Sequence, residues 1–239
     1  RVIVGTTDTP VDETPLEPRP MREEIDFLLK HTARYLTKDP SASDVLSMFA
    51  GLRPLVSLGK EDNTAAISRD HTVHISRSGL VTIAGGKWTT YRKMAEDTID
   101  HAAVIAQLDA VPCVTKNLQI HGYHKHADKF GDLACYGSDA PAIKDLLNEN
   151  PEHNKKLHPN LPYKIGEIIW AVRHEMARTV EDFLSRRTRA LLLDAKASLK
   201  ISSIVSDYMT KELGKNQSWK EEQIRNYKKI AKNYFINNG

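Results

Sequence analysis

The feature that most constrains the fold is a long apolar stripe in the second half of the chain. Over residues 165–193 apolar side chains recur at steps of three and four, the period of a helix with one buried face. The stripe consists of Ile165, Ile168, Ile169, Val172, Met176, Val180, Phe183 and Leu184. We expect further helices over residues 142–149, 195–213 and 218–235, the last of them capped by Ser218 with Glu221 three residues later.

The charge balance and the predicted secondary structure of the chain change near its middle. Residues 1–108 carry 13 basic and 15 acidic side chains, and residues 109–239 carry 21 and 16. The first part mixes β-type runs with Gly and Pro turns, whereas almost no β-type alternation follows Ile120. The sequence therefore predicts an α+β N-terminal part, residues 1–108, followed by an all-α C-terminal domain, residues 109–239.

Composition excludes several classes of protein. A formal net charge of +3 over 239 residues is too balanced for a nucleic-acid binder. No apolar run approaches the ~20 residues that a membrane-spanning helix needs. The two cysteines, Cys113 and Cys135, are too few for a disulfide scaffold. This composition favours a cytoplasmic protein.

The first forty-four residues contain one predicted strand and two predicted helices. Arg1–Thr6 is β-branched and apolar, which favours a short buried strand. No residues precede this strand, so we expect a fragment that lacks an N-terminal part. A strand edge left unpaired in this way would favour a homo-oligomer. Residues 9–20 hold four prolines and form an irregular loop, Arg22–Leu36 has a helical apolar face, and a second helix is expected to begin at Ser43 or Asp44.

The clearest candidate for a ligand-binding site is the point where a predicted strand is followed by two glycines. β-type runs cover residues 66–76 and 80–84, Gly85 and Gly86 follow, and a helix is expected to begin near Thr89 or Thr90. Glycines allow positive φ and let the backbone approach a ligand closely. A helix start presents N–H groups, and Lys87 adds a full positive charge. The segment is either a site for an anion or electron-rich heteroatom, or an ordinary strand–turn–helix connection.

Several segments in a fixed order resemble one enzyme family. They are Val4-Gly-Thr-Thr-Asp-Thr9, Ala50-Gly-Leu-Arg-Pro-Leu55, Ile67-Ser-Arg-Asp-His71 and Gly85-Gly-Lys-Trp-Thr-Thr-Tyr-Arg-Lys93. They resemble the FAD-dependent, aerobic-type glycerol-3-phosphate dehydrogenases of the glycine-oxidase-like flavoprotein superfamily. Residues 171–184, with Arg186, Arg187 and Arg189, resemble the helical C-terminal domain of that family. The resemblance extends to about Asp194.

The resemblance implies a fold and an activity. Residues 1–108 would be the C-terminal part of the FAD-binding and substrate domain, and residues 109–239 an α-helical cap. The whole protein would oxidise sn-glycerol 3-phosphate to dihydroxyacetone phosphate, with hydride transfer to FAD and electrons passed to a quinone or, in oxidase relatives, to oxygen. Such an enzyme would sit peripherally on the inner face of the cytoplasmic membrane. No Gly-x-Gly-x-x-Gly loop occurs in these 239 residues, so we expect the chain alone to be inactive and to bind FAD weakly.

The resemblance also assigns site residues. Gly85, Gly86, Lys87, Trp88, Thr89 and Thr90 would bind the cofactor near its flavin ring, and Lys87 would also be catalytic. Arg53 and Arg69 would bind the substrate phosphate, because a guanidinium holds phosphate oxygens in a bidentate fork. Without the resemblance, both arginines would be interpreted as partners in surface salt bridges, for example with Asp62 or Asp70. His71 and His74 lie on a candidate strand but match no base of the family, so the base is expected elsewhere in the protein.

Other patterns carry less information. His121, His124 and His126 lack a fourth ligand at a familiar spacing, and no metal is expected. Two other functions remain open. One is an amino-acid or amine oxidase of the same superfamily, whose substrate carboxylate needs one arginine. The other is a helical interaction or membrane-docking module, suggested by the 7 basic and 4 acidic residues of the amphipathic tail 201–239.

Overall fold

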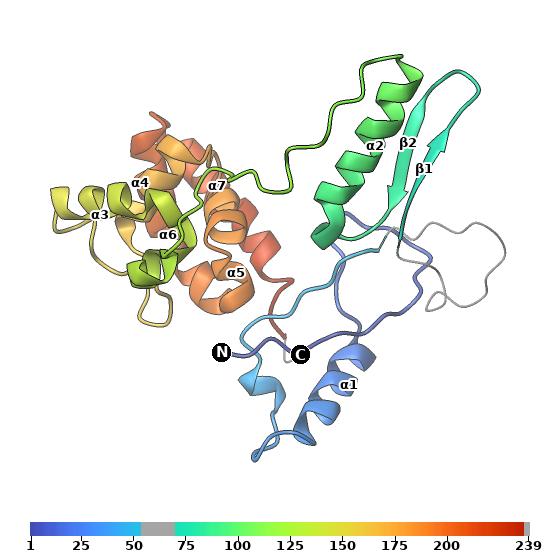
Figure 1. Ribbon diagram of the computed structural model, residues 1–239. Coiled ribbons are helices and arrows are strands. Elements are labelled where there is room, and N and C mark those ends of the chain that lie inside the picture. Colours follow the sequence, from blue (N-terminus) through green and yellow to red (C-terminus); the bar gives the residue numbers. More distant parts are fainter. Residues whose placement is uncertain (54–69, 237–239) are drawn as a thin grey trace. The chain divides into compact units, whose positions relative to one another are not determined.

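The computed structural model describes residues 1–53 and 70–236, which fall into two compact units (Figure 1). The helical unit comprises Arg1–Thr7, Pro15–Gly51 and the chain from His121 onward. The hairpin unit comprises Asp8–Thr14 and the described part of Leu52–Ile120. The described chain therefore combines a two-stranded sheet and its helix with a helical region, which is the mixed α and β content that the sequence predicted.

The hairpin unit contains two antiparallel strands and one long helix. β1 (His71–Ile75) pairs with β2 (Val81–Gly85) so that His71 lies opposite Gly85 and Val73 opposite Ile83. A 3₁₀ turn over Trp88–Thr90 then leads into α2 (Tyr91–Ile105), which packs on both strands (Figure 1). Alternation along the strands turns one face toward α2, as the period of two requires.

The described helices of the helical unit are α1, a 3₁₀ turn, a longer 3₁₀ stretch, α3, α4, a π-helical turn, α5, α6 and α7. Their bounds are Arg22–Ala33, Ala42–Asp44, Ala127–Asp139, Ala140–Glu149, Ile165–His174, Asp182–Arg187, Ala190–Leu193, Ala195–Glu212 and Gln217–Ala231. Every one of these described helices is too short or too polar to cross a bilayer.

The core of the helical unit lies among α4, α6 and α7. Ile168, Phe183, Val205 and Tyr227 are almost completely buried in it. A second cluster, Ile143, Leu146, Leu147, Ile169 and Trp170, joins α3 to the other side of α4. α4 contributes buried residues to both clusters. It therefore supplies part of the buried apolar area that is the main favourable term in folding.

Small polar side chains let α7 approach α6 closely. Ser198, Ser202 and Ser206 are spaced by four residues along α6 and are all buried. The Ser198 hydroxyl is hydrogen-bonded to the Tyr227 hydroxyl, and Ser206 donates to the Lys220 carbonyl at 3.3 Å. The buried hydroxyls are thus paired, as burial of a polar group requires.

The apolar stripe is not one helix. α4 ends at His174, and Met176 has φ +57° and a side chain that is 74% exposed. After this break Asp182 accepts hydrogen bonds from the Arg178 and Thr179 N–H groups, and the chain continues as the π-helical turn. Seven of the eight residues of the predicted stripe are buried, and the prediction for Met176 was wrong.

Two predictions for the N-terminal segment were also wrong. Arg1–Thr6 forms no strand, and Val2 and Ile3 are more than 80% exposed. β propensity reflects the fit of a side chain to a paired, half-buried surface, and no described strand pairs with this segment. The helix expected from Ser43 or Asp44 is only the 3₁₀ turn, because Asp44 Oδ2 turns back to accept from the Ser41 N–H at 2.8 Å.

Tertiary contacts fix the chain that follows this turn. The Leu46 carbonyl accepts from the Ala195 N–H at 3.0 Å, and the Met48 N–H donates to the Tyr234 carbonyl at 2.8 Å. Residues 46–48 therefore run extended against the helical unit. Such contacts commonly override a local helical tendency.

Candidate functional site

The Gly85–Gly86 turn has the strand–turn–helix form that the sequence predicted. Gly85 and Gly86 have φ +77° and +80°. A Cβ on Gly85 would lie 2.7 Å from the Asp70 carbonyl oxygen, and one on Gly86 would lie 2.4 Å from Met94 Sδ. Both positions therefore require glycine, for backbone conformation and for space.

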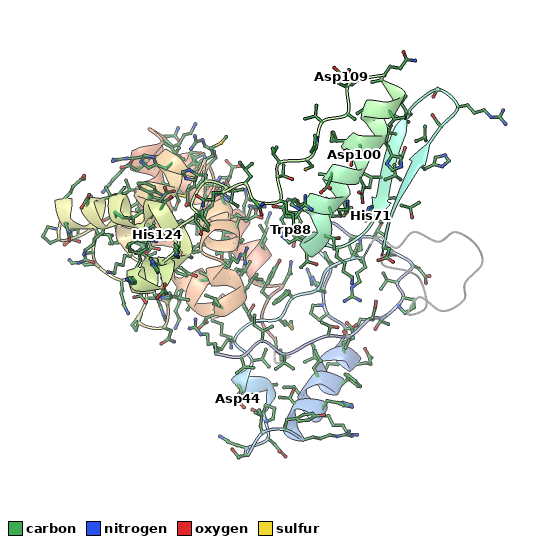
Figure 2. The ribbon with its side chains drawn as sticks, viewed as in Figure 1. Asp44, His71, Trp88, Asp100, Asp109 and His124 are labelled. Carbon is green, nitrogen blue, oxygen red and sulfur yellow. The ribbon has the colours of Figure 1, made fainter. Side chains whose placement is uncertain are left out.

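The residues after the turn are exposed. Lys87 is exposed, and its N–H donates to Thr90 Oγ1 at 3.2 Å while Thr90 Oγ1 donates to the Lys87 carbonyl at 3.0 Å. Trp88 is 84% exposed and stacks on Tyr91, with ring centroids 5.2 Å apart. The turn thus presents one cation and an aromatic surface at the start of α2 (Figure 2).

A charged network lies beneath the turn. His71 Nε2 is 2.8 Å from Asp97 Oδ2, and Lys93 Nζ is 2.8 Å from Asp97 Oδ1. Hydrogen bonds from Lys93 and then from His71 lower the pKa of the Asp97 carboxyl. Figure 2 shows His71 and Trp88 at the same end of the hairpin, which agrees with the pairing of His71 with Gly85.

An apolar hollow lies on another face of α2. It has a volume of about 390 Å³ and is lined by Ile83, Tyr91, Met94, Ala95, Thr98 and Ile99. Lys87 does not line this hollow, but it lies next to the exposed ring of Trp88. A cation beside aromatic surface suits an anionic or electron-rich ring system, because the surface packs on the ring and the cation meets its charge.

The structure describes one of the two predicted phosphate-binding arginines. Arg53 forms an ion pair with Asp8 Oδ2 at 2.5 Å, and both side chains are partly exposed. In the described part of the chain no hydrogen bond or ion pair joins Arg53 to the Gly85–Thr90 turn. Arg69 lies outside the described residues. The structure thus brings Lys87 through Thr90 together and assigns Arg53 a carboxylate partner that sequence reasoning had not named.

The histidine cluster has ordinary polar contacts. His121 Nε2 is 2.8 Å from Asp139 Oδ2, and His124 packs beside His126 and Phe130. Across residues 1–53 and 70–236 no three His, Cys, Asp or Glu side chains converge as metal ligands would.

Two buried or half-buried acids were missed at the sequence level. Asp97 lies two turns into α2. Its partner His71 lies 26 residues earlier, on β1, so no local sequence pattern could reveal the pair. Glu167 is 2% exposed and accepts from Tyr136 Oη at 2.8 Å and from the Lys164 N–H at 2.7 Å. The signal for Glu167 was a lone carboxylate inside the apolar run 165–172.

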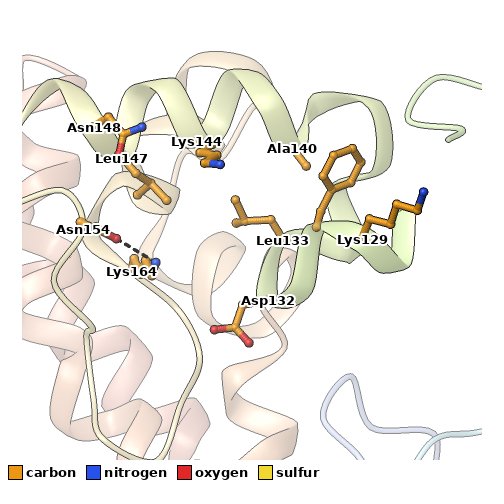
Figure 3. A pocket seen from close by; sticks show the side chains of 10 residues that line it. Lys129, Asp132, Leu133, Ala140, Lys144, Leu147, Asn148, Asn154 and Lys164 are labelled. Carbon is orange, nitrogen blue, oxygen red and sulfur yellow. Dashed lines mark hydrogen bonds between the residues drawn. The ribbon is translucent and has the colours of Figure 1, made fainter. Parts of the chain in front are cut away.

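A second pocket lies in the helical unit, near Glu167. It has a volume of about 320 Å³, and Lys129, Lys144 and Lys164 stand at its edge (Figure 3). Lys164 Nζ donates to Asn154 Oδ1 at 2.8 Å, and the Asp132 carboxylate offsets part of the positive charge. Lys129 and Lys144 are exposed to solvent at this edge.

Comparisons with known proteins point in one direction. Residues 113–224 match the family described as the C-terminal domain of alpha-glycerophosphate oxidase. The mitochondrial glycerol-3-phosphate dehydrogenase of Macaca fascicularis is 37% identical over 250 residues, covering 95% of this chain and 34% of the relative. A probable mitochondrial glycerol-3-phosphate dehydrogenase of Caenorhabditis elegans is 35% identical over 245 residues, covering 93% of this chain and 34% of the relative.

A solved structure extends the similarity to three dimensions. The X-ray structure of the glycerol-3-phosphate dehydrogenase from Bacillus halodurans, complexed with FAD, matches with a TM-score of 0.73 and 28% identity. The match covers 96% of this chain and 48% of that one. The chain spans about a third of the length of the curated relatives it matches.

Proposed function

We infer that this chain is the C-terminal part of an FAD-dependent glycerol-3-phosphate dehydrogenase, and we propose that the whole protein oxidises sn-glycerol 3-phosphate to dihydroxyacetone phosphate. The observation that carries the proposal is the exposed Gly85–Thr90 turn, with Lys87 as its cation, in a chain of which 95% aligns with an enzyme of that name. The alternative amine or amino-acid oxidase has no comparable support.

We propose that residues 1–108 belong to the domain that binds flavin and substrate, and that residues 109–239 form a helical cap. The expected boundary falls where α2 has ended and the chain runs exposed from Gln107 to Ile120. Every described residue that is fully buried lies after that segment, which supports a cap with its own core.

The turn residues fit the ring end of FAD. Gly85 is exposed and Gly86 half-buried beside the exposed Lys87, which would supply positive charge next to a bound flavin ring. When bound, FAD supplies a hydride acceptor. The protein's own task is then to hold the alcohol carbon against the ring and to stabilise developing negative charge.

Substrate recognition is assigned to Arg53 and Arg69. Two guanidinium groups suit a phosphate dianion, whereas a carboxylate needs only one. Because Asp8 is paired with Arg53, a bound phosphate has to replace the Asp8 carboxylate or share the guanidinium with it. We therefore expect Asp8 to set the affinity of this position.

The electron acceptor and the location follow from the proposed reaction. We propose a quinone as acceptor and a peripheral position on the membrane that carries the quinone pool. The sequence favoured the inner face of the cytoplasmic membrane, whereas the Macaca and Caenorhabditis relatives are named mitochondrial. The expected self-association through an unpaired strand edge loses its basis, because Arg1–Thr6 forms no strand.

The proposed function is tested on the full-length protein. It should purify yellow, and anaerobic sn-glycerol 3-phosphate should bleach the flavin absorbance, which a soluble quinone analogue should then restore faster than oxygen does. The 239-residue chain alone should bind FAD far more weakly in a fluorescence titration, because it lacks a Gly-rich pyrophosphate loop.

Two results would contradict the proposal. The first is a full-length protein without flavin. The second is a flavin that an amino acid or amine reduces and glycerol 3-phosphate does not.

A further inference from the structure

The end of the hairpin unit that carries the Gly85–Gly86 turn is held by one histidine. β1 begins at His71, which pairs in register with Gly85, the last residue of β2. A Cβ on Gly86 would lie 3.3 Å from the His71 Cβ. The His71 side chain therefore packs directly against the turn.

The same histidine reaches the helix that follows the turn. His71 Nε2 is 2.8 Å from Asp97 Oδ2, and the two side chains are only 22% and 26% exposed. Lys93 Nζ, 2.8 Å from Asp97 Oδ1, fixes the other oxygen of the carboxylate. Neutral His71 then carries its proton on Nε2, the nitrogen that donates to Asp97.

The other described side-chain contacts of the turn join residues at most three positions apart, namely Lys87 with Thr90 and Trp88 with Tyr91. Gly85 and Gly86 have no side chains, both have positive φ, and Lys87 and Trp88 are exposed. The hydrogen bond between His71 and Asp97 links β1, which pairs with the strand before the turn, to α2, the helix after the turn. Without that pair, α2 could shift relative to the hairpin, and the backbone at Lys87 would move with the turn.

We propose that His71, oriented by Asp97, is a positioning residue that fixes the Gly85–Gly86 turn and hence Lys87. The inference rests on the proposed function for its effect on turnover, but its effect on the turn is independent of that function. His71 acts through the turn and need not touch the substrate, so the variant should lower turnover more than substrate affinity.

The test compares His71→Ala, His71→Gln and His74→Ala in the full-length holoenzyme. Glutamine places an amide donor near the position of Nε2 and should retain the bond to Asp97. His74 is exposed on the same strand and serves as the matched control. We expect His71→Ala to lower kcat about tenfold or more, with KM for glycerol 3-phosphate changed less than about twofold, because small misplacement in a site is costly. His71→Gln should recover most of the loss, and His74→Ala should resemble the wild type.

A second measurement does not depend on activity. Amide hydrogen exchange over residues 82–92, measured on the cofactor-free protein, should be faster in His71→Ala than in the wild type or in His71→Gln. Asp97→Ala should produce the same change, and the double variant should exchange no faster than either single one, as expected for residues that act as one unit.

The outcomes separate the two proposals. Unchanged exchange over residues 82–92 in His71→Ala overturns the positioning role whatever the activity. A KM effect that equals the kcat effect, or a loss that glutamine does not recover, also overturns it. A wild type that is inactive with glycerol 3-phosphate, but in which His71→Ala still accelerates exchange, refutes the substrate proposal and supports the role of His71 at the turn.

Discussion

Glu167 combines deep burial with an ionisable group. Its carboxylate accepts two hydrogen bonds, from Tyr136 and from the Lys164 N–H, yet burial raises its pKa to about 7. The nearby Asp132 carboxylate acts in the same direction. The folded protein therefore holds a proton on Glu167 at a pH where the unfolded chain has lost it.

The sign of the resulting pH dependence is fixed by this raised pKa. The stabilising contribution is complete below the unfolded pKa of 4.5 and is lost as the pH rises through about 7. Its size is on the order of 3 kcal/mol. We expect Glu167→Gln to abolish this part of the decline in the free energy of unfolding between pH 5 and pH 8, as measured by urea denaturation.

Glu152→Gln is the matched control, because the Glu152 side chain is half exposed and pairs with Lys155 at the surface. It should leave the pH profile unchanged. An equal slope in wild type and Glu167→Gln would show that Glu167 does not titrate in this range.

Arg53 is the other single residue with a clear expected effect. If Arg53 and Arg69 bind the substrate phosphate, Arg53→Ala and Arg69→Ala should each raise KM for glycerol 3-phosphate roughly ten- to a hundredfold, the usual loss of a charged hydrogen-bond partner. The measurement is steady-state kinetics of the full-length enzyme, with flavin content checked by absorbance.

Arg77, in the exposed β1–β2 turn, provides the control. Arg77→Ala should leave KM unchanged. An unchanged KM in both of the other variants would remove the phosphate assignment and leave Arg53 as the surface partner of Asp8.

At the scale of elements, the N-terminus of α7 has two candidate capping residues, Asn216 and Ser218. The sequence favoured Ser218 because Glu221 follows at the capping-box spacing. In the structure Asn216 is the cap, and its side chain accepts from the Trp219 N–H at 3.0 Å. Asn216→Ala should lower the free energy of unfolding by roughly 1 kcal/mol, and Ser218→Ala by much less. Chemical denaturation of the two variants decides, and equal losses would refute the assignment of the cap.

Elements that depend on periodicity or on glycine could be predicted from the sequence. α3, α4 and α6 lie where the sequence predicted helices, and α2 begins at Tyr91, next to the start expected after the two glycines. The positive φ values at Gly85 and Gly86 follow from the residue type. The break at Met176 could not be predicted, because apolar spacing continues through it. Val180 and Phe183 remain on the buried face after the backbone has changed direction.

The candidate site was predictable only where it is contiguous in sequence. Lys87, Trp88 and Thr90 follow the glycines directly, so the strand–turn–helix pattern located them. The ion pair of Arg53 with Asp8 joins residues 45 positions apart, and the bond of His71 to Asp97 joins residues 26 apart. Such partners depend on tertiary folding, which local patterns do not encode.

For the whole molecule, the position of the core predicts which part of the chain can fold by itself. The two core clusters of the described residues lie entirely between Ala140 and Ala231. Pro15–Gly51 adds backbone hydrogen bonds, such as Met48 to Tyr234, but no buried residue. A polypeptide of residues 109–239 should therefore melt cooperatively by circular dichroism, and Phe183→Ala within it should cost about 3–5 kcal/mol.

A non-cooperative, mostly coil spectrum of residues 109–239 would show that the N-terminal segments are needed for folding. In that case the domain boundary at residue 108 would be wrong as a folding boundary, even though the cap contains the core.

The exposed segment between Gln107 and Ile120 has a consequence for how such a chain tolerates change. It contains no helix or strand, and its side chains face solvent. A protease that nicks accessible backbone should cut here before it cuts α2 or the helices from Ala140 onward. A peptide tag or a fluorescent protein inserted after Asn117 should likewise leave both units folded. This stretch is thus a place at which evolution or an engineer can lengthen the polypeptide without disturbing either unit.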